Sequence, residues 1–141
     1  MEIDLALLAD AATVDASGKL NILGVFDRIS VPRFPAQYPH ISLVLRFGAG
    51  MNEAGAHRVE ILLADPEGAT VMKMNGDLKV GPGSAATGGR VKVPQILNLD
   101  RLPLKIPGQY SFNVSVDGEH HVSVPLQVDD TGGRGTGARA C

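Results

Sequence analysis

Apolar and polar residues alternate along much of this chain. In the stretch 110–116, apolar residues occupy every second position, at Tyr110, Phe112, Val114 and Val116. The stretch 122–128 repeats the pattern with Val122, Val124, Leu126 and Val128. A period of two places these side chains on one face of a β-strand. The pattern therefore predicts antiparallel strands with one face in the core and the other in solvent.

The same alternation predicts strands near 40–48, 57–64, 69–80 and 90–99. Asp65-Pro66-Glu67-Gly68 is a turn signal between two of them. Gly76 is expected to mark a bulge, and the broken alternation after Pro94 is expected to mark a bend between sheets. The small polar stretch 81–89 is expected to be a surface loop.

The N-terminal stretch admits two interpretations. Ile3, Leu5 and Leu7 suit a strand, whereas Leu5, Leu8 and Ala12 suit a helix. We favour a pair of strands, because a short turn at 15–18 joins two apolar runs of similar length. The stretch 30–39 holds three prolines and two aromatic residues. It cannot be a regular central strand, so we expect a crossover between sheets.

The turn signal Asp117-Gly118 constrains the register of the final hairpin. A two-residue turn would set Val114 opposite His121, and so an apolar face against a polar one. A loop of three residues, 117–119, or of five keeps the faces matched, with Gly118 at a positive φ. Pro125 lacks an amide donor, so we expect the last strand to be an edge strand or to bulge there.

These elements predict an all-β fold, an antiparallel sandwich of about eight strands of the immunoglobulin-like or C2-like kind. The chain has 141 residues, enough for one domain with its own core, which we place at 1–128. The glycine-rich tail 129–141 holds too few apolar groups to fold and is expected to be disordered.

Charge and cysteine content exclude several classes of partner and site. The net charge of −2 gives no field that would gather nucleic acid or a membrane surface, so neither partner is expected. Cys141 is the single cysteine, which excludes an internal disulfide and a cysteine-based metal cage. The acidic start, Met1-Glu2-Ile3-Asp4, lacks the positive charge of a secretory signal. We therefore expect a cytoplasmic protein.

Candidate chemistry is sparse. His120 and His121 stand beside acidic residues, but neighbours on a strand point to opposite faces, which favours a polar hairpin end over a metal site. Calcium-binding sandwich domains hold the ion with aspartates from loops at one end. The loop aspartates of this chain are better explained as turn formers; they are Asp15, Asp65, Asp117, Asp129 and Asp130. No Gly-x-Ser-x-Gly elbow or phosphate loop occurs. We predict no catalytic residue, no metal ligand and no cofactor, and hence no enzyme.

Two features suggest partner binding. Phe34 and Tyr38 on the proline-rich crossover are either an exposed partner patch or a plug for the open end of the sandwich. Val122 and Val124 lie on the expected edge strand, whose unpaired amides can add another strand. We predict a non-enzymatic protein-interaction or scaffold module, with an unknown protein partner or self-association through a strand edge. The alternative is a calcium- or small-ligand-binding sandwich that uses its end loops.

Four stretches carry a family resemblance: residues 3–12 (IDLALLADAA), 18–27 (GKLNILGVFD), 107–110 (PGQY) and 116–119 (VDGE). They resemble a family of small bacterial proteins catalogued as a domain of unknown function. The resemblance covers residues 2–128, implies an all-β sandwich and supports the strand interpretation of the N-terminal stretch. It implies no activity, cofactor or site residue. The final hairpin is also similar to the closing strands of immunoglobulin-like domains, which is an analogy of fold alone.

Overall fold

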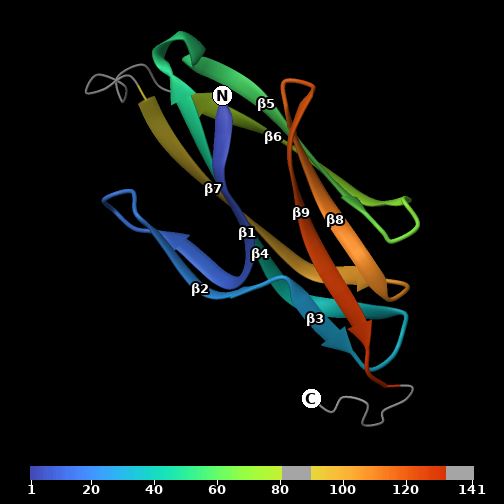
Figure 1. Ribbon diagram of the computed structural model, residues 1–141. Coiled ribbons are helices and arrows are strands. Elements are labelled where there is room, and N and C mark those ends of the chain that lie inside the picture. Colours follow the sequence, from blue (N-terminus) through green and yellow to red (C-terminus); the bar gives the residue numbers. More distant parts are fainter. Residues whose placement is uncertain (81–89, 133–141) are drawn as a thin grey trace.

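The computed structural model describes residues 1–80 and 90–132 and is all-β (Figure 1). A four-stranded sheet has the order β2-β1-β4-β7, and a five-stranded sheet has the order β3-β9-β8-β5-β6. The described residues thus form nine strands, one more than the predicted number, and one short 3-10 helix, η1. The elements are β1 (Glu2–Val14), β2 (Leu20–Phe26), β3 (Arg28–Val31), β4 (Ala36–Gly50), η1 (Met51–Glu53), β5 (Gly55–Ala64), β6 (Thr70–Val80), β7 (Arg90–Leu104), β8 (Gly108–Val116) and β9 (Glu119–Asp130).

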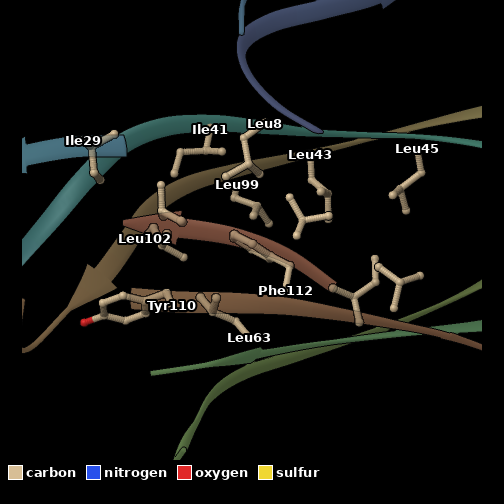
Figure 2. Packing of buried hydrophobic residues seen from close by; sticks show 14 of the residues in the cluster. Leu8, Ile29, Ile41, Leu43, Leu45, Leu63, Leu99, Leu102, Tyr110 and Phe112 are labelled. Carbon is tan, nitrogen blue, oxygen red and sulfur yellow. The ribbon is translucent and has the colours of Figure 1, made fainter. Parts of the chain in front are cut away.

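The inner faces of the two sheets meet in one core. Leu43 and Leu45 of β4 point toward Leu63 of β5 and Phe112 of β8 (Figure 2), and all four are at most 1% exposed. Burying a side chain of this size contributes about 1.5–3 kcal/mol relative to leaving it in water. The alternation at 110–116 is confirmed, because Tyr110, Phe112, Val114 and Val116 are all buried while the residues between them are not.

Two aspartates build matching turns. The Asp15 carboxylate accepts hydrogen bonds from the amides of Ser17 and Lys19 at 2.9 and 3.0 Å. The Asp65 carboxylate accepts from the amides of Glu67 and Ala69, each at 2.9 Å. In both turns a glycine three residues after the aspartate has a φ of 88°. The first turn joins β1 to β2, which confirms the N-terminal strand pair, and the second joins β5 to β6.

The final hairpin has the predicted register and a different turn. Phe112 pairs with Val124 and Val114 with Val122, as the matched faces require. However, Val116 pairs with Glu119, so the turn has two residues rather than three or five. Asp117 and Gly118 both have positive φ, 52° and 84°, as a tight hairpin turn requires. The register shifts after Val114, and this bulge of one residue brings the apolar faces back into line.

The last strand is not an edge strand along its whole length. The short strand β3 pairs in parallel with the end of β9. Arg28 lies beside Gln127 at one end of this pairing, and Val31 lies beside Asp130 at the other. The sandwich is therefore not purely antiparallel. The stretch between β3 and β4 passes from one sheet to the other, which confirms the crossover. Part of the predicted crossover is strand, because β4 begins at Ala36 and includes Pro39.

Two irregularities fall elsewhere than predicted. Gly76 pairs with Val59 in an uninterrupted register, so it marks no bulge. The strand β7 runs through Pro94, and its buried positions change from odd to even between Leu99 and Leu102. Arg101, between them, has a φ of 53° in the left-handed region. A left-handed residue turns the strand, so the inner face changes at Arg101. The predicted bend between sheets after Pro94 was wrong, because β7 stays in the four-stranded sheet.

Two predictions fall wholly or partly outside the described residues. The predicted surface loop at 81–89 lies entirely outside them, and so does the predicted tail from residue 133 onward. Asp129 and Asp130 belong to β9, where they pair with Ser30 and Val31. No helix within the described part of the chain is long and apolar enough to cross a membrane.

Candidate functional site

The two sheets leave an opening between β6 and β7. Each of these strands is the last in its sheet, and residues of both line one cavity, so the two lie on the same side of the sandwich. Between them is a cavity of about 110 Å³ that reaches the core, which we call the β6–β7 slot. Four strands supply its apolar wall, with Leu45, Phe47, Val59, Ile61, Met74, Leu78 and Leu97. Phe47 and Leu45 are 0% and 1% exposed, so the slot lies directly over the core.

Two interruptions in the inner rows of side chains produce the slot. The inner row of β6 runs through Met74, Gly76 and Leu78, so a side chain is missing at its middle. A Cβ added at Gly76 would have no atom within 4 Å. The inner row of β7 runs through Val93, Gln95 and Leu97, and Gln95 pairs with Leu45. Both Gly76 and Gln95 line the slot.

A wider hollow lies on the other open side of the sandwich. It measures about 360 Å³ and lies between β1, β2 and β9, with Leu8, Val25, Phe26 and Val124 among its lining residues. Val25 in this wall is 61% exposed. A hollow walled by exposed side chains gives a ligand little burial, so the β6–β7 slot is the better candidate for a small molecule.

The outer face of the four-stranded sheet is also apolar. Leu7 of β1 pairs with Val44 of β4, and Val44 pairs with Ile96 of β7, so all three share that face. Leu23 of β2 continues the face at 70% exposure. The hairpin of β1 and β2 extends outward from the rest of the sheet (Figure 1). This face therefore carries apolar side chains outside the shared core.

A serine, a histidine and an aspartate lie in line on the same outer face. His40 Nδ1 is 2.7 Å from Asp100 Oδ1, and His40 Nε2 is 3.1 Å from Ser42 Oγ. These are the residue types of a hydrolase triad. However, Ser42 is 0% exposed, and its hydroxyl donates to Asn98 Oδ1 at 2.8 Å. A substrate cannot reach that oxygen, so the arrangement acts as a polar tie between β4 and β7.

A second histidine–carboxylate pair, His57 and Asp117, lies at the turn between β8 and β9. His57 Nδ1 is 2.7 Å from Asp117 Oδ2, and His57 Nε2 donates to the Glu53 carbonyl at 2.6 Å. A neutral imidazole has one N–H, so two acceptors favour the charged ring. The bond to Asp117, followed by the Glu53 carbonyl, raises the pKa of His57 above 6.5. The same histidine holds the pKa of Asp117 below 3.8. Neither histidine pair lines the β6–β7 slot or the hollow.

The loop aspartates are engaged in turns and ion pairs. Asp15 and Asp65 cap their own turns, and Asp129 binds Arg28 at 2.7 Å. The hydrogen bond from the Lys19 amide is the main cause of the lowered pKa of Asp15. Within residues 1–80 and 90–132, no three His, Cys, Asp or Glu side chains come together as a metal site would require. The described loops thus offer no geometry that favours calcium.

The residues predicted to bind a partner do not form one patch. Phe34, Tyr38 and Val122 are partly buried against the core, and Val124 is 5% exposed. Val124 alone reaches the hollow. Their role in partner binding stays a prediction. Sequence reasoning overlooked Gln95, although its signal was visible, because it interrupts the alternating row of Val91, Val93, Leu97 and Leu99.

The comparisons with known proteins give a family. A model described as a family of unknown function, DUF6941, matches residues 4–129. The chain belongs to the DUF6941 family. This confirms the resemblance to a domain of unknown function, and the DUF6941 description assigns no activity to it. No curated protein matches the chain.

Among solved structures, the DUF6941 chain is similar to the alkylpurine DNA glycosylase AlkC of Pseudomonas fluorescens, bound to DNA containing an abasic site analog. The TM-score is 0.54 and the sequence identity is 12%; the match covers 91% of this chain and 30% of the glycosylase chain. At this identity the likeness shows the fold alone. The chain thus corresponds to less than a third of its structural neighbour.

This neighbour contradicts the predicted partners. We expected an unknown protein partner or self-association through a strand edge, and excluded nucleic acid, whereas a similar fold occurs in a protein bound to DNA. The exclusion was wrong because net charge describes the whole chain, while contact with DNA depends on local charges. The strand-edge contact is withdrawn as well, since β3 covers the end of β9.

Proposed function

We propose that the chain is a non-enzymatic, cytoplasmic sandwich domain that binds a small apolar ligand in the β6–β7 slot. One observation carries the proposal: the inner row of β6 lacks a side chain at Gly76, and the space left there lies over the buried residues Leu45 and Phe47. Protein interiors are normally packed without such gaps. A gap that is open to solvent and walled by apolar side chains is what a small ligand requires.

The size and lining of the slot support this ligand class. An engineered cavity of about 150 Å³ with an apolar lining binds benzene. The β6–β7 slot, at about 110 Å³, is smaller, but it is open at one end, so a ring can enter and remain partly exposed. Side chains that face a gap lose dispersion contacts on that side, and a bound ring would restore them.

The fold type forms part of the proposal. Tyr110 lies near the start of β8, and its hydroxyl donates to the Ile106 carbonyl at 2.6 Å. In immunoglobulin-like sandwiches a tyrosine near the start of a strand makes such a bond to backbone a few residues upstream. This bond supports the immunoglobulin-like assignment over the C2-like one.

A methyl-resolved NMR titration with toluene tests the proposal. Toluene should shift the methyl signals of Met74, Ile61 and Leu78 in the slot and leave those of Leu104, at the far end of β7, unchanged. Gly76→Val should abolish the shifts, because its side chain occupies the open space. Lys79→Val is the matched control, since it adds the same side chain at an exposed position of β6. Unshifted slot methyls at saturating toluene would refute the proposal.

A second candidate function is contact with DNA, which the DNA-bound state of the structural neighbour favours. The pairing of Ala36 with Leu104 brings two chain segments together at one end of the β4–β7 ladder. These segments carry the exposed cations Arg33, Arg101 and Lys105. With a net charge of −2, any contact with phosphate must rest on such a local group.

Fluorescence polarisation of a labelled DNA duplex at several salt concentrations tests this second candidate. Binding should weaken as the salt concentration increases. The double variant Arg101→Gln, Lys105→Gln should reduce the slope of the logarithm of the binding constant against the logarithm of the salt concentration by about one for each cation removed. Exchanging Lys79, a cation on the distant strand β6, for Gln is the control. Absence of binding at low salt would rule out this function.

A further inference from the structure

We propose that Gln95 makes the β6–β7 slot selective for a neutral ligand that combines an apolar ring or short chain with one hydrogen-bonding group. This inference rests on the proposed ligand-binding function and adds the chemistry of the ligand to it. Gln95 is the polar position in the inner row of β7, between Val93 and Leu97. Its pairing with Leu45 directs its side chain toward the same face as that buried leucine.

The Gln95 amide has no partner within the described residues. No hydrogen bond of its side chain to another group occurs in residues 1–80 and 90–132, and the side chain is partly buried. A ligand that enters the slot withdraws this amide from water, and a polar group withdrawn from water without a partner is unfavourable. Its carbonyl oxygen accepts and its NH₂ group donates, so a hydroxyl group on a ligand matches either end.

The other polar residues that line the slot favour a neutral ligand. Asn75 and Asp77 flank Gly76, but they pair with Glu60 and Arg58, so their side chains belong to the outer face of the sheet. Asp77 carries the one carboxylate of the lining, and because its side chain faces outward no counter-ion faces the apolar wall, so a ligand of either charge is unfavourable there. The described lining has no cation to hold a carboxylate or phosphate. The ligand class is therefore an uncharged alcohol, phenol or amide rather than an acid.

Phenol and toluene have the same shape and differ in one hydroxyl group, so they isolate the role of Gln95. Their dissociation constants are measured from the Met74 and Leu78 methyl signals in the natural chain and in Gln95→Met. Removing one hydrogen bond should weaken phenol relative to toluene by about tenfold in the variant. Gln109→Met, on the outer face of β8, is the control and should leave the ratio unchanged.

The outcomes separate this inference from the proposed function. If both ligands bind and their ratio changes in Gln95→Met, Gln95 is the selective residue. If both bind and the ratio is the same in the variant, the selectivity is refuted while the ligand-binding function stands. If neither binds to the natural chain, both fail. Gln95→Leu repeats the test with a second apolar side chain, and near-identical methyl spectra outside the slot establish that each variant is folded.

Discussion

Two glycines of this chain have opposite roles although both lie in hairpins. Gly118 has a φ of 84°, which an L-residue with a side chain adopts only at a cost, and it forms the turn between β8 and β9. Gly76 lies within β6, has no such φ, and a Cβ there would meet no atom within 4 Å. Substituting alanine at both positions therefore separates the cost of backbone strain at Gly118 from the effect of a side chain placed in empty space at Gly76.

We expect Gly76→Ala to raise the free energy of unfolding by about 0.4–1 kcal/mol, because it restricts the unfolded chain and strains nothing in the fold. We expect Gly118→Ala to lower it by about 1–2 kcal/mol, because the turn requires a left-handed residue. Urea denaturation of both variants beside the natural chain measures the two changes. A destabilised Gly76→Ala variant would show that the slot is not open at that position.

The pair of His57 and Asp117 links stability to pH. The raised pKa of His57 means that its contribution is complete below 6.5 and is lost as the pH rises through the folded-state pKa. The lowered pKa of Asp117 means that its contribution is complete above 3.8 and is lost as the pH falls through its folded-state pKa. The pair therefore stabilises the fold most between these two values.

We expect His57→Gln to cost most stability between about pH 4 and 6.5, and less at alkaline pH, where the natural histidine is neutral as well. Urea midpoints measured from pH 4 to 9 test this. Asp117→Asn keeps a side chain that tolerates positive φ and removes the charge, so in its background the pH dependence of the His57→Gln effect should decrease, with the Glu53 carbonyl as the remaining cause. A cost that does not vary with pH would contradict the ion pair.

At the scale of elements, the segment between β7 and β8 is held by one buried side chain. Tyr110 is 1% exposed, and its hydroxyl donates to the Ile106 carbonyl. Burial raises the pKa of Tyr110 above 10, so the hydroxyl keeps its proton at neutral pH. The bond connects the start of β8 to the segment that precedes it.

We expect Tyr110→Phe to lower the free energy of unfolding by about 1–3 kcal/mol, since the Ile106 carbonyl loses its partner while the ring remains in the core. Tyr38→Phe is the control, because Tyr38 is partly buried and its hydroxyl has no hydrogen bond within the described residues. Thermal unfolding of the two variants measures the difference. Equal melting temperatures would show that this bond adds nothing to stability.

Most strands could be predicted because apolar alternation is a local signal. The inner row of β8 is visible in seven consecutive residues, Tyr110 to Val116, without knowledge of its neighbours. The pairing of β3 with β9 could not be predicted this way, since Ile29 and Val31 give no indication of a partner strand a hundred residues later. The β6–β7 slot was overlooked for the same reason: Gly76 and Gln95 lie on different strands, and the order of the sheets brings them together.

At the scale of the whole molecule, the five-stranded sheet depends on the pairing of β3 with β9, two strands that lie far apart in the sequence. Arg28 of β3 binds Asp129 of β9 across 101 residues, at 2.7 Å. Ile29 and Val31 of β3 and Val128 of β9 belong to the common core. Removal of one member of this pair exposes apolar side chains of the other, so the effect extends to the packing of both sheets.

We expect a chain that ends at residue 126 to lose cooperative unfolding, whereas one that ends at residue 132 should unfold as the natural chain does. The first lacks the β9 residues that pair with β3, and the second keeps all of them. Circular dichroism at increasing temperature distinguishes a sharp transition from a gradual one. A sharp transition in the shorter chain would show that β3 docks without its parallel neighbour.

The parallel pair also sets an order of events during synthesis. Residues 28–31 are synthesised about a hundred residues before the strand that fixes them, residues 127–130. Until then the earlier segment has no neighbour with which to bond, and contacts between residues so far apart in sequence form slowly. Closure of the sandwich therefore waits for residues 127–130, and the nascent chain must keep Ile29 and Val31 from aggregating until those residues have been made.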